Sequence, residues 1–160
     1  MRQAGLLLSP LVLIGACSAP PVEPWSEVTV IGVVDGDTID VEIAGAGRER
    51  VRLIGIDTPE SVIPGEAPEC FGPEAAARLS ALLPEGTPVS LERDVEARDP
   101  YGRLLAYVYR ADDMINLQLA GEGFADALSI PPNTAWADQI ARSVALARQQ
   151  RAGLWGACTL

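Results

Sequence analysis

Residues 28–43 read VTVIGVVDGDTIDVEI, and this stretch decides the class of fold. Its two runs rich in β-branched residues, 28–34 and 38–43, predict two strands separated by a turn or bulge at Asp35-Gly36-Asp37. After a turn of small residues, 49–56 predicts a third strand. The folded part of the chain is therefore expected to open with three consecutive strands.

The remainder of the chain is expected to alternate loops, helices and short strands. Interruptions by Pro and Gly predict a loop over 58–72, and Pro73 then opens a helix whose apolar residues recur at helical spacing until Pro84. The other expected elements are strands at 89–91 and 104–109, a short helix ending at Gly121, and a final helix capped by Asn133 or Thr134 that runs to about 151, with Gly153 as its stop. This order predicts an α+β fold built on a small closed barrel of five strands.

The composition excludes several classes of enzyme. The chain of 160 residues is long enough for one folded domain, expected over 27–160. Its twelve basic residues are all Arg and it has no His, which excludes Ser-His-Asp catalysis and His-ligated zinc. The net charge of −10 disfavours a protein that holds nucleic acid by charge alone. This charge favours an enzyme that binds a polyanionic substrate transiently, at one site where the local charge is positive.

The first residues form a predicted export signal. Residues 1–16 combine a basic start, a short apolar run and small residues, which predicts a signal peptide, and the run is too short to span a bilayer. Because Ile14-Gly15-Ala16 stands directly before Cys17, the sequence favours a bacterial lipoprotein with lipid on Cys17 and a Pro-rich tether over 17–26. The protein is then expected to be extracytoplasmic and anchored to a membrane. The alternative is an ordinary signal peptide cut at Ala16 or Ala19, which would give a secreted protein.

The two remaining cysteines, Cys70 and Cys158, are expected to pair in an oxidising compartment. Because they lie far apart in the sequence, a bond between them would stabilise the fold by about 4 kcal/mol in the chain-entropy model. It would also pin the C-terminus. The alternative is a pair of unrelated buried thiols.

Three short clusters of charged residues carry the chemistry of the chain: Asp35-Gly36-Asp37-Thr38, Arg52 with Asp57-Thr58-Pro59-Glu60, and Tyr101-Gly102-Arg103. Together they supply the carboxylates and guanidinium groups needed to hold a hard cation, activate a water and neutralise a phosphate. A metal-dependent phosphodiesterase is therefore the first hypothesis. Taken alone, each cluster is more often a turn, a helix start or a solvated side chain.

The spacing between Arg52 and Asp57 restricts how their side chains can come together. Strict alternation along a strand would place Arg52 and Asp57 on opposite faces, because the two residues are five positions apart. They can converge only if the strand ends or bulges between them, and Gly55 is the natural place for that break.

The ordered set of clusters resembles the staphylococcal nuclease family over roughly residues 27–156. The same resemblance extends to Gly72-Pro73-Glu74-Ala75, to the segment 101–108, to Asn116 and to Gly153-Leu154-Trp155. The family implies an OB-fold barrel with about three helices. It also implies calcium-dependent endonuclease activity on DNA and RNA that leaves a 3′-phosphate and a 5′-hydroxyl.

Carried over position by position, the resemblance implies a site for one calcium ion. Asp37 and Asp57 would bind the ion through their carboxylates, with the main-chain carbonyl of Thr58 beside them. Asp35 would shape the surroundings of these ligands. Glu60 would be the general base on the attacking water, kept ionised by the neighbouring positive charges.

The resemblance also implies how the substrate is held. Arg52 and Arg103 would grip the scissile phosphate, and Tyr101 would lie near the terminal phosphate of the nucleotide. The chain departs from the family at Pro100, where the type member has a lysine, and at 129–131, where it has a pair of tyrosines. Activity with a weaker grip on substrate is therefore expected.

Three functions remain open at this point. The leading hypothesis is an extracytoplasmic nuclease that acts on DNA, RNA or both as a monomer. The first alternative is a barrel that binds nucleic acid without cutting it, but such a protein would not need the carboxylates. The second is a calcium-dependent surface protein with a protein partner, which leaves the two arginines unexplained.

Overall fold

The computed structural model describes residues 27–159 of the chain. The predicted signal peptide 1–16, the lipid-bearing Cys17 and the tether 17–26 lie outside the described residues, so they stay predictions. Within 27–159, no helix combines the length and the apolar character needed to cross a membrane.

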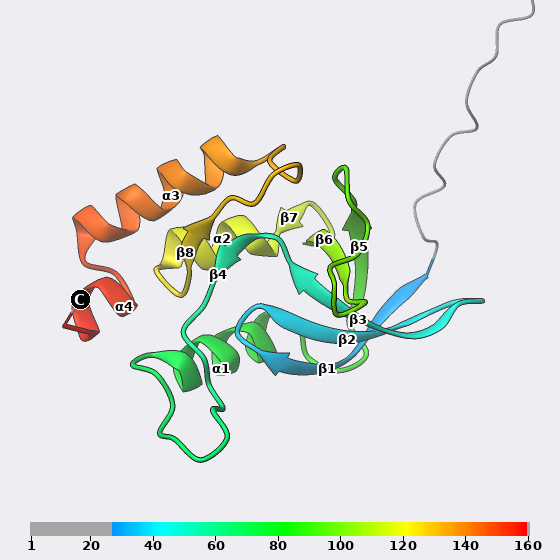
Figure 1. The fold of residues 1–160 in the computed structure, drawn as a ribbon, viewed down its shortest axis with the longest axis horizontal. Coiled ribbons are helices and arrows are strands. Elements are labelled where there is room, and N and C mark those ends of the chain that lie inside the picture. Colours follow the sequence, from blue (N-terminus) through cyan, green and yellow to red (C-terminus); the bar gives the residue numbers. More distant parts are fainter. Residues whose placement is uncertain (1–26, 160) are drawn as a thin grey trace, which may run out of the picture.

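A closed barrel of five strands forms one half of the domain (Figure 1). The strands lie in the order β3-β2-β1-β5-β6, and a parallel pairing of β3 with β6 closes the barrel. This architecture confirms the predicted α+β barrel. The barrel strands are β1 (Val28–Asp35), β2 (Thr38–Ile43), β3 (Gly47–Leu53), β5 (Pro88–Glu92) and β6 (Leu104–Arg110).

Helices α1, α2 and α3 pack outside the barrel, and a one-turn helix, α4, lies near the C-terminus (Figure 1). Their bounds are α1 (Gly72–Leu82), α2 (Ile115–Glu122), α3 (Ala137–Gln150) and α4 (Leu154–Ala157). The sequence did not predict α4. The predicted cap of α3 is also wrong, because Asn133 binds the main chain of Glu96 instead and the helix begins at Ala137 without a side-chain cap.

One apolar core joins the barrel to the helices. Inward-facing residues of the strands alternate with exposed ones, as in β5, where Val89 and Leu91 are buried between exposed neighbours. From the other side, the helices contribute fully buried residues such as Leu79, Leu119 and Ile140. Because the barrel interior and the helix faces share this core, the strand ends that carry the charged clusters are held in place by packing.

The predicted third strand over 49–56 is in fact two strands. β3 ends at Leu53, and the chain turns before it forms β4 (Gly55–Asp57), which pairs with β8 (Asp126–Leu128) in a separate small sheet. Gly55 has φ +83°, and a Cβ there would lie 2.5 Å from Ile140 Cδ1, so the break requires glycine. The sequence missed β8 and the short β7 (Asp113–Met114), both at most three residues long.

The polarity of the acidic residues around 92–99 suggests a solvated face, but two of these residues accept hydrogen bonds from neighbouring segments. Asp94 Oδ2 accepts hydrogen bonds from Tyr107 Oη at 3.1 Å and from Ala135 N at 2.8 Å. Glu92 accepts from Tyr109 Oη at 2.6 Å and from Trp136 Nε1 at 3.0 Å. These carboxylates therefore tie strands β5 and β6 to the segment that leads into α3.

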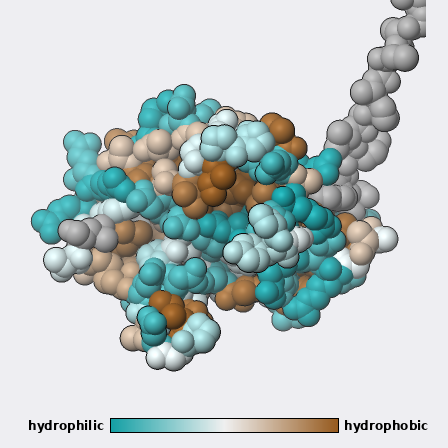
Figure 2. Space-filling view, viewed as in Figure 1, coloured by the Kyte–Doolittle hydropathy of each residue, from teal (hydrophilic) through white to brown (hydrophobic). Residues whose placement is uncertain are grey.

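The segment between β4 and α1, residues 58–71, contains no helix or strand and projects from the body of the domain (Figures 1 and 2). Figure 2 shows that the visible face of the molecule is largely hydrophilic, with apolar side chains gathered in small separate areas. Cys70, near the end of this segment, forms a disulfide with Cys158, as the sequence predicts. The projecting segment is thus joined covalently to the C-terminal end of the domain.

Candidate active site

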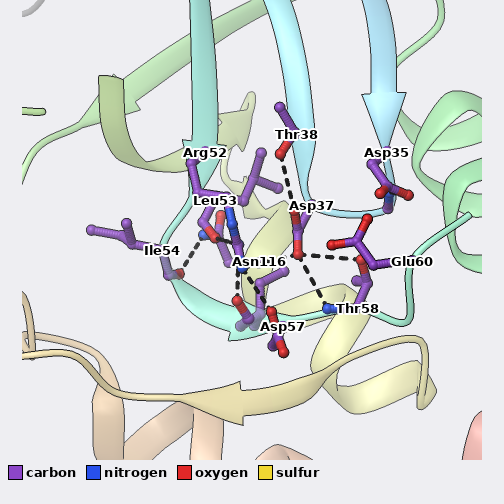
Figure 3. A network of polar contacts seen from close by, with 12 residues as sticks. Asp35, Asp37, Thr38, Arg52, Leu53, Ile54, Asp57, Thr58, Glu60 and Asn116 are labelled. Atoms are coloured by element: carbon purple, nitrogen blue, oxygen red, sulfur yellow. Dashed lines mark hydrogen bonds and ion pairs between the residues drawn. The ribbon is translucent and has the colours of Figure 1, made fainter. Parts of the chain in front are cut away.

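Asp37 is the best anchored carboxylate of the three clusters. It lies in the turn between β1 and β2, and its Oδ2 accepts hydrogen bonds from Thr58 N at 3.1 Å and Thr58 Oγ1 at 3.2 Å (Figure 3). Its Oδ1 accepts from Thr38 Oγ1 at 3.0 Å. Gly36 makes this approach possible, since a Cβ at that position would lie 2.5 Å from Thr58 Oγ1.

Arg52 links the two predicted metal-binding carboxylates. The register of β2 and β3 places Arg52 opposite Thr38, next to Asp37. Its Nη2 lies 3.0 Å from Asp37 Oδ2 and 2.9 Å from Asp57 Oδ1. The predicted condition for this convergence is met, because the chain turns at Gly55 and brings Asp57 back toward the guanidinium of Arg52.

The turn at the end of β3 is held by hydrogen bonds from two side chains. Arg52 Nη1 donates to the carbonyls of Leu53 at 2.6 Å and Ile56 at 2.9 Å. Asn116, fully buried in α2, donates to the carbonyl of Ile54 at 2.8 Å and accepts from Val108 N at 2.9 Å (Figure 3). Sequence analysis noted Asn116 only as part of the resemblance. Its position between Ile115 and Leu117 in an apolar helix is the signal for a buried amide with a structural task.

Glu60 faces a second carboxyl group, that of Asp35 (Figure 3). A hydrogen bond with Asp35, burial, and the negative charges of Asp35, Asp37 and Glu69 raise the pKa of Glu60 to about 7. Burial alone would raise the pKa of Asp35, but hydrogen bonds from Glu60, Ser61 and Gly36 outweigh it and hold that pKa below its usual value. The carboxyl group of Asp35 is therefore a direct partner of Glu60, and the ionised Glu60 expected beside a bound cation stays a prediction.

Glu69 is a contact of Glu60 that sequence analysis missed. Its Oε2 accepts a hydrogen bond from Glu60 N at 2.9 Å, and its own N–H donates to the Glu60 carbonyl at 3.0 Å. No local pattern indicates this pairing, because the two residues lie nine positions apart in a loop without regular structure.

Arg103 is held at the start of β6 by the loop that precedes it. Its Nε lies 2.6 Å from Asp99 Oδ2, and its N–H donates to Asp99 Oδ1 at 2.9 Å. The Arg103 guanidinium also lies over the ring of Tyr101, 5.6 Å from its centroid. The Tyr101 side chain is 85% exposed, so most of this ring is open to a ligand.

The residues predicted for catalysis meet around one cavity of about 470 Å³. Its charged lining consists of Asp35, Asp37, Arg50, Arg52, Asp57, Glu60 and Arg103. Tyr101 does not line this cavity. It lines a neighbouring apolar pocket of about 300 Å³ with Ile54, Pro100, Leu128 and Ile130, and the two hollows share Arg52 and Arg103. The three clusters, separate in the sequence, therefore form one continuous site.

The donor atoms at the cavity suit a hard cation. The part of the chain that the structure describes contains no group of three or more acidic or cysteine side chains placed to hold a metal. An ion would therefore rely on the carboxylates of Asp37 and Asp57, a main-chain carbonyl and water, a set of oxygen ligands that calcium accepts. Burial and the charges of Asp37, Glu69 and Asp126 raise the pKa of Asp57 despite Arg52. Burial is the largest of these causes, and the neighbouring carboxylates add negative charge that favours a cation.

Known nucleases are similar in sequence to this chain. The family described as staphylococcal nuclease homologue matches residues 50–157. The chain is 42% identical over 123 residues to a thermonuclease of Staphylococcus intermedius, covering 77% of this chain and 72% of that protein. It is 38% identical to a thermonuclease of Staphylococcus hyicus, covering 79% and 73% of the two chains. It is also 37% identical to the SPbeta prophage-derived endonuclease YokF of Bacillus subtilis, covering 81% of this chain and 44% of that protein. The chain therefore belongs to the staphylococcal nuclease family.

Proposed function

We propose that this protein is a calcium-dependent endonuclease that hydrolyses phosphodiester bonds of DNA, RNA or both and leaves 3′-phosphate and 5′-hydroxyl ends. One observation carries the proposal. In a member of the staphylococcal nuclease family, Asp37, Arg52, Asp57, Glu60 and Arg103 line a single cavity. Relatives named thermonuclease and endonuclease support the same chemistry.

The two arginines bind the scissile phosphate in this proposal. Arg52 is held by the carbonyls of Leu53 and Ile56 and by two carboxylates, so its guanidinium is already ordered before substrate arrives. Asp99 binds Arg103 through Nε, which leaves the Nη groups of Arg103 for a phosphate. Paired N–H donors of this kind stabilise the equatorial oxygens as negative charge builds in the transition state.

Glu60 is the general base. Its carboxyl group lines the cavity beside both arginines, where the carboxylate can accept the proton of the attacking water, and a positioned base contributes roughly 10²–10⁴-fold in rate. Asp35 faces Glu60 and hydrogen-bonds with it. The water attacks phosphorus and the bond to the 5′-oxygen breaks. The leaving 5′-oxygen takes a proton from an arginine or from water, and the 3′ side keeps the phosphate.

Asp37, Asp57 and the carbonyl of Thr58 would hold one calcium ion, which when bound supplies charge neutralisation and polarises a phosphoryl oxygen. Asp37 is already fixed by Thr38 and Thr58. The exposed Asp57 follows the turn at Gly55 and is oriented by Arg52. The chain thus presents one rigid and one accessible carboxylate to the ion.

The exposed ring of Tyr101 and the apolar pocket beside it are the proposed contacts for the rest of the nucleotide. They adjoin the phosphate site through Arg52 and Arg103. With Pro100 and Ile130 lining this pocket, the chain offers apolar surface there, which supports the expected weaker grip on substrate.

The proposal places this nuclease outside the cytoplasm, as a monomer anchored to a membrane through lipid on Cys17. The Cys70–Cys158 disulfide supports an oxidising compartment. Replacing Cys17 with Ser is expected to move the protein from the membrane fraction to the soluble fraction. Continued membrane retention of that variant would contradict the anchor.

One assay tests the enzymatic proposal. The purified full chain is incubated with DNA or RNA, in calcium or in chelator, beside Glu60→Gln and the control Glu66→Gln from the same loop. We expect cleavage in calcium only, loss of at least about 100-fold in Glu60→Gln, and full activity in Glu66→Gln. End-labelling of the products checks for 3′-phosphate and 5′-hydroxyl ends. Binding without cleavage by the unaltered chain would instead support a nucleic-acid-binding barrel.

A further inference from the structure

The proposed base, Glu60, lies on the least structured part of the domain. Residues 58–71 form no helix or strand, and most side chains between 62 and 70 are exposed, with Val62 at 74%. Packing therefore holds this segment weakly, and a segment with few buried apolar contacts opens readily. A general base must nevertheless stay within hydrogen-bond reach of the water that it activates.

Next to Glu60, Ser61 N donates to Asp35 Oδ1 at 3.2 Å, and Glu69 adds a second restraint from within the loop. It binds Glu60 twice, with Oε2 accepting from Glu60 N at 2.9 Å and Glu69 N donating to the Glu60 carbonyl at 3.0 Å. Gly72 N in turn donates to the Glu69 carbonyl at 3.0 Å. A Cβ at Gly72 would lie only 2.2 Å from the Glu60 carbonyl oxygen, so the two ends of the loop are in close contact.

The disulfide extends this restraint to the body of the protein. Cys70 directly follows Glu69 and is bonded to Cys158, which ends α4. Leu154, at the start of α4, is buried and donates from its N–H to the Gly123 carbonyl at 2.9 Å, next to the end of α2. Glu69 is therefore adjacent to a covalent link between the loop and the packed C-terminal end.

We propose that Glu69, held in place by the Cys70–Cys158 disulfide, is a positioning residue that fixes Glu60 for catalysis, so that breaking the disulfide lowers turnover. The inference rests on the proposed role of Glu60 as base. It predicts an effect on kcat rather than on KM, because the arginines that bind phosphate lie outside the loop. Arg52 is on β3 and Arg103 immediately precedes β6.

A pair of substitutions at Glu69 tests the hydrogen bond. Glu69→Ala removes the acceptor for Glu60 N, and we expect kcat to fall roughly 10-fold with KM within about twofold, since small displacements of a catalytic group cost this much or more. Glu69→Gln removes the same negative charge but keeps a carbonyl oxygen as acceptor, so it should retain kcat within about threefold of the unaltered chain. Glu66→Ala is the control in the same loop.

The disulfide is tested in parallel. Reduction of the unaltered chain, or the double substitution Cys70→Ser with Cys158→Ser, is expected to lower kcat by about 10-fold and leave KM within about twofold. Assays are run well below the melting temperature of each form, with near-ultraviolet circular dichroism as the check for folding. Amide hydrogen exchange at Glu60 should accelerate at least about 10-fold, while the amide of Leu53 in the barrel keeps its protection.

The outcomes separate this inference from the proposed function. If Glu60→Gln is inactive while Glu69→Ala and the reduced protein keep full kcat, Glu60 is the base but the positioning role is overturned. Equal losses in Glu69→Ala and Glu69→Gln would also overturn it, because the hydrogen bond would then not be the cause. If Glu60→Gln is fully active, the proposed base is wrong. Slow amide hydrogen exchange at Glu60 after reduction of the disulfide would independently refute the restraint by Glu69 and the disulfide. Because Glu69→Ala retains the disulfide, the test does not depend on the folding of the cysteine variants.

Discussion

The two sides of the catalytic cavity are built differently. On the barrel side, Asp37 and Arg52 are largely buried and belong to a hydrogen-bonded strand register. On the loop side, Glu60 is exposed and depends on Glu69, Asp35 and a nearby disulfide. From this difference we expect the proposed binding of phosphate and cation to depend on the stability of the barrel, whereas the position of the proposed base can vary while the barrel stays intact.

The largest expected effect on activity is on the barrel side, at Arg52, where stability is expected to fall as well. Arg52→Ala removes a proposed phosphate ligand and leaves the buried Asp37 without its positively charged partner. We therefore expect kcat to fall about 10²–10³-fold and the free energy of unfolding to fall by about 3 kcal/mol. Steady-state kinetics and urea denaturation measure both. The matched control, Arg78→Ala, breaks an ion pair with Glu122 away from the cavity and should leave kcat unchanged. If Arg52→Ala lost activity but kept its free energy of unfolding, the barrel side of the cavity would not be tied to the stability of the fold.

The second effect is on the loop side and concerns stability. Reducing the Cys70–Cys158 bond, whose partners are 88 positions apart, should lower the free energy of unfolding by about 4 kcal/mol, because the unfolded chain gains conformational freedom. Urea denaturation with and without reductant measures this in a Cys17→Ser background, where no third thiol interferes. A change below about 1 kcal/mol would mean that the unfolded chain is already compact around these residues.

A third, smaller effect is predicted for Asn116, which supports the turn between the two sides. Asn116→Ala leaves the buried Ile54 carbonyl and Val108 N–H without their partner, which should cost about 2–3 kcal/mol in the free energy of unfolding. Thermal and urea unfolding measure the loss. Gln118→Ala, in the same helix but partly exposed, is the control and should cost less than about 1 kcal/mol. Equal losses in the free energy of unfolding for Asn116→Ala and Gln118→Ala would show that the buried hydrogen bonds of Asn116 add no extra stability.

The smallest effect tests the buried Asp40 of the barrel and its two exposed arginine partners. Hydrogen bonds from Arg50 and Arg48 lower the pKa of Asp40 below its usual 3.8 despite burial. A lowered folded pKa stabilises the fold above 3.8, and this contribution is lost as pH falls through the folded value. Because the arginines are exposed, Asp40→Asn should cost only about 1 kcal/mol at pH 7.

The measurement for Asp40 is a series of urea unfolding curves between pH 7 and pH 2. The difference between the unaltered chain and Asp40→Asn should shrink steadily below pH 3.8. A difference that stays constant across this range would show that the ion pairs do not contribute to stability.

Much of the barrel could be predicted because its signals are local. The β-branched runs around Asp35-Gly36-Asp37 define β1 and β2, and Pro73 marks the start of α1 within one residue. The failures have physical reasons too. Strands β4 and β8 are three residues each and form because they pair with one another. Asn133 hydrogen-bonds the main chain of Glu96 and therefore does not cap α3.

For the site, the available chemical groups and their order along the chain follow from the sequence alone. Carboxylates, arginines and the absence of histidine limit the chemistry however the chain folds. Three contacts of the site depend on the tertiary structure: Arg52 bridges Asp37 and Asp57, Glu60 faces Asp35, and Glu69 binds Glu60 within the loop. The reason is that these contacts join segments distant in the sequence, whose separation depends on packing and strand register rather than on local conformational preference.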